Sequence, residues 1–271
     1  QLTLAPAWQF QTIPAGQPCA SRVEFIRELR ARLDDTIRAH LLADVPVGAF
    51  LSGGLDSAII TGLMARASGA RLKTFSIGFE ESAFSEADTA AATARHLGTE
   101  HHPQILTGAQ VAGDIGQLIA TLDQPTGDGI NTYYVSQAAR AGGVTVALSG
   151  LGGDELFGGY PSFRDLPRLG RWLPGWHRLP TGLRRPILAR LQRGGTRARK
   201  LADFLAHARS LDDLCALQRR VFTEPARQAL LAPELRAQTG ALSPLHPLRH
   251  DLGADLAGAD PQSVISAWEL R

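Results

Sequence analysis

The spacing of hydrophobic residues changes along the chain, and these changes predict where strands and helices lie. Four short apolar runs are typical of buried strands: 47–51, 73–79, 101–106 and 144–148. Apolar residues three and four positions apart predict helices at about 21–41, 58–64, 85–97, 107–122 and 131–141. Because strands alternate with helices, we expect an α/β fold, in which helices cover both faces of a parallel twisted sheet.

Capping residues mark the ends of several of these helices. Ser21–Glu24 and Ser85–Asp88 each place a hydroxyl three residues before a carboxylate, which predicts the start of a helix. Thr107 is a third candidate N-cap. Gly98 is a candidate C-cap, because glycine adopts the left-handed conformation that ends many helices.

The pattern changes after about residue 165. Strand-like runs stop, Arg, Leu and Ala become frequent, and Pro and Gly interrupt the remaining helical segments. We therefore predict three parts: a linker at 1–20, an α/β core at 21–165 and a mainly helical extension at 166–271.

Composition narrows the class of protein. Of the 271 residues, 44% are hydrophobic and 20% are charged, which allows a packed core and excludes a disordered or fibrous chain. No apolar run reaches the roughly 18 residues of a membrane helix, and the first residues lack the features of a secretory signal. Cys19 and Cys215 lie far apart, which indicates no disulfide framework and favours a reducing, cytoplasmic location. The formal net charge of +2 is too balanced to indicate nucleic-acid binding.

A glycine-rich loop follows the first predicted strand. Ser52–Ser57 (SGGLDS) leads into a helix, a place where backbone N–H groups converge on an anion. Its two glycines let the backbone approach a phosphate, and its two serine hydroxyls are further donors. The only lysines are Lys73 and Lys200, so the loop is not the usual lysine-bearing phosphate loop. Asp56 is instead a candidate Mg²⁺ ligand; the alternative is a tight turn with a capping side chain.

A second loop of the same kind follows the last predicted strand. Ser149–Tyr160 (SGLGGDELFGGY) again combines glycines, a hydroxyl and an acidic pair, Asp154 and Glu155. By itself it also fits a glycine-rich turn at the start of a helix. Two such loops after strands of one parallel sheet favour a site for a metal ion and a triphosphate. We predict that Asp56 and Asp154 share Mg²⁺ bound to the phosphates of a nucleotide.

Several motifs, taken in order, resemble one family. Ser52–Ser57 resembles the pyrophosphate loop of the ATP-pyrophosphatase superfamily, and Ser149–Tyr160 resembles the second signature of glutamine-hydrolysing asparagine synthetases. Thr74–Phe79 (TFSIGF) and His96–His102 (HLGTEHH) match that family in order and spacing. Ser263–Arg271 (SVISAWELR) resembles it too. The resemblance implies an ATP-pyrophosphatase-like fold for the core.

The resemblance also implies an enzyme, a carbon–nitrogen ligase of asparagine biosynthesis. ATP would activate the side-chain carboxylate of aspartate as β-aspartyl-AMP and release pyrophosphate. Ammonia, normally from glutamine, would then give asparagine and AMP. The implied cofactors are ATP and Mg²⁺, and the implied partners are aspartate, ammonia or glutamine, and a glutaminase domain in the same chain. A homodimer is compatible with the family, and neither nucleic acid nor a membrane is expected.

The resemblance assigns roles to individual positions. Residues expected to contact the nucleotide are Leu51, Ile77, Ser149 and Gly150. Residues expected to hold the pyrophosphate are Ser52, Gly53, Gly54 and Ser57. The expected catalytic carboxylates are Asp56, Asp154 and Glu155, of which Asp56 and Asp154 are the metal ligands. Asp123 and Asp128 are expected either to contact the substrate amino group or to cap helices.

Departures from the family pattern leave alternatives open. Leu151 replaces an acidic residue that the family has near the intermediate, and Glu155 or Asp128 is a candidate substitute. One alternative is therefore a different carboxylate acceptor, in an amidotransferase or a lactam-forming ligase; another is a non-catalytic nucleotide-binding module. The chain starts at Gln1 without a glutaminase domain and stops at Arg271 before the family's catalytic lysine, so we expect a fragment with an incomplete site.

Two further features have simpler explanations. His101 and His102 are adjacent on a predicted strand, so their side chains point to opposite faces and do not chelate one metal. Between residues 166 and 202 the chain has nine arginines and Lys200 but no acidic residue. Such a run also occurs in proteins that bind nucleic acid, anionic lipid or an acidic partner. We favour a solvated helical face or an interface with the glutaminase domain.

Overall fold

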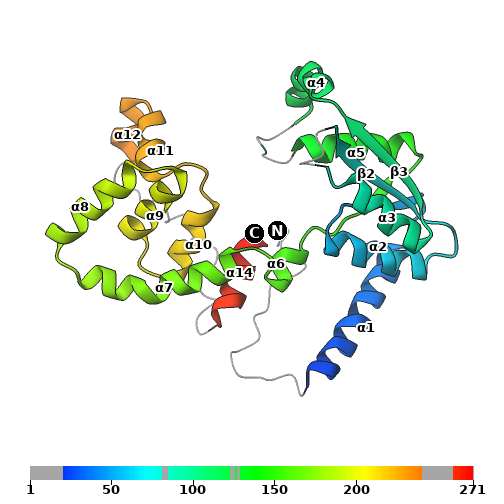
Figure 1. The fold of residues 1–271 in the computed structure, drawn as a ribbon, viewed down its shortest axis with the longest axis horizontal. Coiled ribbons are helices and arrows are strands. Elements are labelled where there is room, and N and C mark those ends of the chain that lie inside the picture. Colours follow the sequence, from blue (N-terminus) through cyan, green and yellow to red (C-terminus); the bar gives the residue numbers. More distant parts are fainter. Residues whose placement is uncertain (1–20, 81–84, 123–125, 127–128, 240–258, 271) are drawn as a thin grey trace, which may run out of the picture. The chain divides into compact units, whose positions relative to one another are not determined.

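The structure is a computed structural model that describes residues 21–80, 85–122, 126, 129–239 and 259–270. Contacts between residues divide the chain into two compact units, residues 18–151 and residues 152–271. The first contains a sheet and its covering helices, and the described elements of the second are all helices (Figure 1). None of the helices described is both long and apolar enough to cross a membrane.

The first unit is built on a parallel sheet, as predicted. Its four strands are β1 (Val47–Phe50), β2 (Lys73–Phe79), β3 (Glu100–Leu106) and β4 (Val146–Leu148). They lie in the order β3-β2-β1-β4, and all three pairings are parallel. The chain thus winds outward from β1 to β3 and returns to β4 on the other side of β1. The direction of winding therefore reverses between β1 and β4, and open parallel sheets bind ligands at such a switch point.

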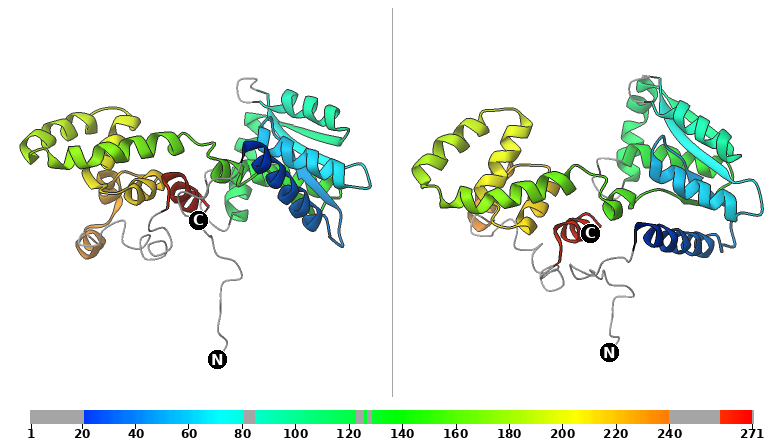
Figure 2. Two further views of the ribbon diagram at one scale, coloured as in Figure 1. Left: turned by 90° about the horizontal axis from the view of Figure 1, so that it is seen from below. Right: turned by 60° about the horizontal axis from the view of Figure 1, so that its bottom comes forward.

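Helices cover both faces of the sheet, which confirms the predicted class (Figure 2). They are α1 (Arg22–His40), α2 (Leu55–Ala67), α3 (Ala87–Leu97), α4 (Gly108–Thr121) and α5 (Gly129–Ala141). The alternation of side chains along β1 explains the two layers. Ala49 packs with Met64 of α2, whereas its neighbour Phe50 packs against the cluster of Phe75 and Ala139, the latter from α5.

The capping signals are confirmed in part. Ser21 and Thr107 each accept a hydrogen bond from an N–H of the first helical turn, at 3.1 and 3.0 Å. Gly98 ends α3 with a φ of 70°. Ser85 is not the N-cap of α3, because Glu86 occupies that position, without a side-chain hydrogen bond to the helix end. The Ser85 hydroxyl nevertheless accepts the N–H of Ala87, the first residue of the helix, at 3.4 Å. The carboxylate of Glu86 is directed to a neighbouring loop instead.

The second unit has its own hydrophobic core. Its helices are α6 (Gly153–Phe157), α7 (Ser162–Arg178), α8 (Thr181–Gln192), α9 (Thr196–His207), α10 (Leu211–Arg219), α11 (Glu224–Leu230), α12 (Pro233–Thr239) and α14 (Pro261–Glu269). Phe163 and Leu173 of α7 are buried with Leu214 of α10 and Ile265 of α14. The sequence pattern changes at residue 166, but Phe163 already packs in this core. The division between the units accordingly falls earlier, after Leu151.

Candidate active site

The loop after β1 is closed on itself around Ser57. The Ser57 side chain is buried, and its hydroxyl lies 2.9 Å from the Ser52 hydroxyl. The Ser57 hydroxyl also accepts the N–H of Ser52 at 3.1 Å and lies 3.1 Å from the carbonyl of Gly54. Ser57 therefore holds the shape of the loop, and its use as a phosphate donor stays a prediction.

The same loop ends at the N-terminus of α2. This helix begins at Leu55, earlier than the hydrophobic spacing predicts, so Asp56 lies in its first turn. Gly54 is the N-cap and contributes no side-chain hydrogen bond. The first N–H groups of a helix have no acceptor within the helix, and the helix dipole favours an anion beside them. The local electrostatics suit the predicted pyrophosphate contact.

The loop after β4 packs directly on the loop after β1. A Cβ atom at Gly150 would lie 2.5 Å from the backbone nitrogen of Ser57 and 2.8 Å from the carbonyl carbon of Asp56. Real Cβ atoms do not come this close to backbone, so position 150 requires glycine. The start of the second predicted loop is thus in contact with the first, beside the paired strands β1 and β4.

The two positions predicted to contact adenosine lie on neighbouring strands. Leu51 directly follows β1, is buried, and donates its N–H to the carbonyl of Phe75 in β2 at 2.8 Å. Ile77 lies further along β2. Both positions are at or near the carboxyl ends of parallel strands, where the sheet binds ligands, and their contacts with a nucleotide stay predictions.

An acidic residue that the sequence analysis missed also reaches the first loop. The Glu86 carboxylate accepts the N–H of Gly53 at 2.9 Å. A Cβ at Gly53 would lie 3.1 Å from Glu86 Cβ, so the start of α3 is tightly packed on the loop. Glu86 lies just before α3, the helix that follows β2, and β2 is the neighbour of β1 in the sheet. An acidic residue at the start of that helix is the sequence feature from which the contact could have been predicted.

The acidic pair of the second loop belongs to the helical unit. Asp154 and Glu155 lie in α6, between Gly152 and Gly158, which have φ values of 93° and 74°. Tyr160 donates its hydroxyl to Glu155 at 2.9 Å. Burial, and then this hydrogen bond, raise the pKa of Tyr160 to about 12. The phenol therefore stays protonated near neutral pH and holds the Glu155 carboxylate in one place.

The carboxylates predicted to bind Mg²⁺ fall in different units, Asp56 in the first and Asp154 in the second, so their sharing of a metal stays a prediction. Carboxylate oxygens are ligands that suit Mg²⁺. Within the described ranges, no three His, Cys, Asp or Glu side chains group as a metal site. Asp123 and Asp128 lie outside the residues that the structure describes.

The side chains of His101 and His102 lie on opposite faces of β3, as predicted. The ring of His101 lies between the hydroxyls of Thr74 and Ser76, at 3.0 and 3.2 Å. Burial, together with neighbouring His102, lowers the pKa of His101. His102 instead contacts Glu100 at 2.9 Å. Each histidine therefore makes its contacts on a different face of β3.

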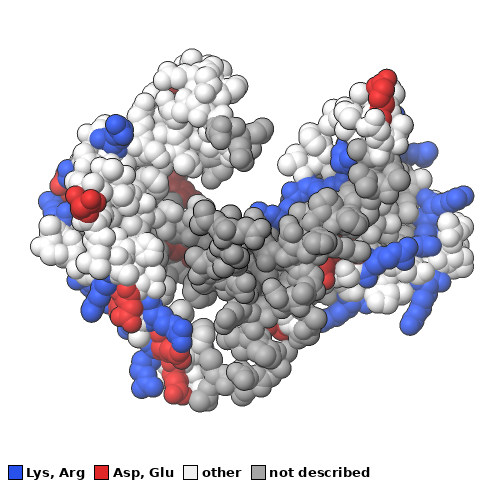
Figure 3. All heavy atoms as spheres, turned by 180° about the vertical axis from the view of Figure 1, so that it is seen from behind, with Lys and Arg blue, Asp and Glu red and all other residues white. Residues whose placement is uncertain are grey.

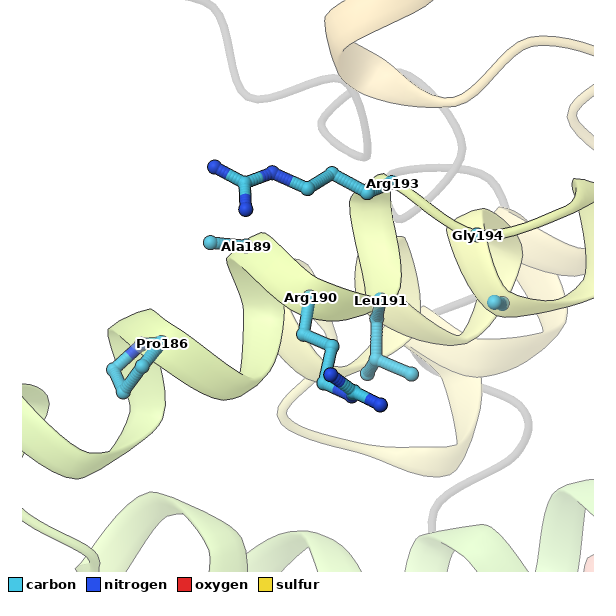
Figure 4. Close-up of a pocket in the computed structure, with 7 residues that line it drawn as sticks. Pro186, Ala189, Arg190, Leu191, Arg193 and Gly194 are labelled. Atoms are coloured by element: carbon cyan, nitrogen blue, oxygen red, sulfur yellow. The ribbon is translucent and has the colours of Figure 1, made fainter.

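The arginine-rich segment lies on the surface of the helical unit, where Lys and Arg side chains gather in Figure 3. A pocket of about 680 Å³ is formed there by α8 and the start of α9. Arg190 and Arg193 line it and extend in different directions from α8 (Figure 4). None of the residues predicted to bind nucleotide or metal lines this pocket.

The fold and the packed loops define a class: a parallel α/β protein whose glycine-rich loop, at the switch point of the sheet, holds a carboxylate on its backbone. A family model described as asparagine synthase matches residues 28–270. The chain belongs to the asparagine synthase family.

Curated relatives have the same family name. The chain is 35% identical over 212 residues to asparagine synthetase [glutamine-hydrolyzing] 1 of Bacillus subtilis (strain 168), covering 77% of this chain and 32% of that protein. It is 36% identical over 157 residues to asparagine synthetase B [glutamine-hydrolyzing] of Escherichia coli (strain K12), covering 52% and 28%. The chain thus spans about a third or less of the length of these relatives.

A solved structure of an NH3-dependent NAD synthetase from Campylobacter jejuni is 14% identical, with a TM-score of 0.37 over 90% of this chain and 92% of that chain. A likeness at this level supports no conclusion about the chain.

Proposed function

We propose that this chain carries the synthetase reaction of a glutamine-hydrolysing asparagine synthetase. In this proposal the side-chain carboxylate of aspartate attacks the α-phosphorus of ATP and displaces pyrophosphate, which gives β-aspartyl-AMP. Ammonia, supplied from glutamine by a glutaminase domain, then displaces AMP and gives asparagine. The observation that carries the proposal is the contact of Gly150 with the backbone of Asp56 and Ser57, since it joins the two family loops at the ligand-binding edge of the sheet.

The residues of the chain suit the charges of this reaction. Both the attacking carboxylate and the leaving pyrophosphate are anions, so the site needs positive potential that is already in place. The N-terminus of α2 and the N–H of Gly53 provide it from backbone groups, without a lysine. Mg²⁺, when bound to Asp56 and Asp154, would neutralise further phosphate charge. Leu151 stands where the family has an acidic residue near the intermediate. Glu155, whose carboxylate accepts a hydrogen bond from Tyr160, is the candidate to take over the role of that acid.

A different carboxylate acceptor is the second candidate function. Leu151 is 88% exposed near the start of the second loop, where the family has an acid. An exposed leucine neither attracts an amino group nor repels an apolar one, which favours an acceptor less polar than aspartate. Activation of such a carboxylate by ATP would proceed by the same step, with release of pyrophosphate.

Release of pyrophosphate from MgATP tests both functions, measured on a protein in which this chain is joined to a glutaminase domain and to the segment with the family's catalytic lysine. We expect release that depends on aspartate together with ammonia or glutamine. Asp56→Asn is expected to lower the rate by about a hundredfold or more, because it removes a charge from the phosphate site. Asp35→Asn, an exposed position on α1, is the matched control and should leave the rate unchanged. Release with another carboxylic acid but not with aspartate would favour the second function. ATP binding without release for any acceptor would contradict both.

A further inference from the structure

The hydrogen bond between Glu86 and Gly53 has a consequence for nucleotide binding. The Glu86 carboxylate lies 2.9 Å from the Gly53 N–H, a donor of the loop proposed to hold pyrophosphate. A carboxylate and a phosphate present the same kind of negatively charged oxygen to such a donor. A single N–H makes one strong hydrogen bond, so the two anions exclude each other at Gly53.

The side chain of Glu86 is free to leave this position. Glu86 is exposed and makes no side-chain hydrogen bond to the end of α3, although it occupies the N-cap. Among the described residues, its carboxylate bonds to the N–H of Gly53, so its release into water breaks the bond to the loop. The other residues of the loop are held by Ser57, whose hydroxyl bonds with Ser52 and Gly54 do not involve Glu86.

We propose that Glu86 sets the affinity of the loop for phosphates, acting as an internal competitor of pyrophosphate. Its carboxylate accepts the Gly53 N–H when the site is empty, and it must be displaced when pyrophosphate or the pyrophosphate end of ATP binds. This competition weakens the binding of pyrophosphate. It also speeds the release of pyrophosphate, because the carboxylate takes over the donor that pyrophosphate gives up. The inference rests on the proposed function, because it takes the loop after β1 as the pyrophosphate site.

Binding of inorganic pyrophosphate in the presence of MgCl2, measured by calorimetry on the whole chain, tests the inference. Glu86→Gln removes the charge and keeps the size of the side chain, so we expect pyrophosphate to bind about fivefold more tightly. Glu86→Ala removes the acceptor altogether and should give at least the same gain. In an activity assay, the KM for ATP should fall while inhibition by pyrophosphate becomes stronger.

Asp88→Asn is the matched control. Asp88 is an exposed carboxylate in the first turn of the same helix, and the structure shows no bond from it to the loop, so its neutralisation changes the general charge but not the Gly53 donor. We expect its pyrophosphate affinity to equal that of the wild type. An equal gain in Asp88→Asn and Glu86→Gln would overturn the inference, because general charge would then explain both.

The outcomes separate this inference from the proposed function. If Glu86 merely supported the loop, both Glu86 variants would bind pyrophosphate more weakly than the wild type, which would overturn the inference while leaving the proposed function intact. If the wild type and all variants bound neither pyrophosphate nor ATP, the proposed function itself would fail. Circular dichroism of each variant would show that the compared proteins are folded.

Discussion

At the residue scale, Gly150 joins the two loops that the family motifs mark. The absence of a side chain at this position lets the backbone of one loop touch the backbone of the other. The family motif predicts a glycine at position 150 that approaches a nucleotide. The structure adds that this glycine first has to approach Ser57, so the geometry of the site depends on it before any ligand binds.

Gly150→Ala tests this dependence. The added Cβ would meet backbone atoms at 2.5 Å, and no side-chain rotation relieves such a contact. The loops must then separate, which we expect to destabilise the first unit by about 1–3 kcal/mol. ATP binding should weaken by about tenfold or more, because its contacts are displaced. Chemical denaturation and calorimetry measure the two effects.

Gly113→Ala is the control for this substitution. Gly113 lies in α4 with open space around its Cβ position, so alanine should stabilise the helix by about 0.5–1 kcal/mol and leave ATP binding unchanged. Unaltered ATP affinity in Gly150→Ala would contradict the role assigned to the loop contact.

At the element scale, β2 and β3 are joined by a buried polar cluster as well as by backbone pairing. His101 of β3 lies between two hydroxyls of β2, and the Thr74 hydroxyl also lies 3.0 Å from that of Thr99. The hydroxyls and the ring satisfy one another away from water, which a buried polar group requires. The hydroxyls of Thr74 and Ser76 belong to β2, the strand next to β1. The cluster therefore stabilises the part of the sheet from which the first glycine-rich loop extends.

The pH dependence of stability should report the protonation of His101. Its pKa is lowered in the fold from the ordinary 6.5, so the unfolded chain takes up the proton first as the pH falls. The stabilisation is therefore complete above about pH 6.5 and is lost as the pH falls below that value. We expect the free energy of unfolding to decline less between pH 7 and pH 5 in His101→Gln than in the wild type.

His96→Gln provides the comparison for this pH series. His96 is exposed near the end of α3, so its replacement should leave the wild-type decline in place. If His101→Gln followed the wild-type curve in parallel, proton uptake by His101 would not explain the loss of stability.

At the scale of the whole molecule, the chain has two compact units with separate cores, and the second is completed by its most C-terminal described helix. Trp268 of α14 is 4% exposed, and its indole N–H donates to Asp212 at 3.1 Å. Glu269 pairs with Arg219 at 2.7 Å. The family-like segment at the end of the chain thus has a structural role in the unit that carries Asp154 and Glu155.

Trp268→Ala should destabilise the helical unit alone. Removing a large buried side chain typically costs about 3–5 kcal/mol. Because the core of the first unit contains no residue of α14, scanning calorimetry should show one transition lowered and the other unchanged. Trp172→Ala is the control, since Trp172 is 76% exposed on α7 of the same unit and its loss should change stability by less than about 0.5 kcal/mol. A common shift of both transitions would contradict independent units.

The sequence predicts features that depend on nearby residues better than contacts between residues far apart in the chain. The strand predicted at 73–79 agrees with β2, and Gly98 ends α3, because hydrophobic alternation and glycine conformation act over a few residues. The N-cap of α3 lies one residue later than predicted, at Glu86, and the bond of Glu86 to the first loop was not predicted. The carboxylate of Glu86 meets its partner Gly53 only when β1 and β2 lie side by side.

The sequence by itself determined the α/β class, the two glycine- and acid-bearing loops, the absence of a lysine from them and the family resemblance. All of these are properties of residue type and order. Only the tertiary structure decided that Gly150 touches Ser57, that Tyr160 holds Glu155 and that Glu86 occupies the N–H of Gly53. The contacts of Gly150 and Glu86 depend on which strands become neighbours in the sheet. The contact of Tyr160 depends on how the chain turns after α6. Residue spacing along the chain does not specify such contacts, because the packing of whole elements fixes the positions of the atoms that make them.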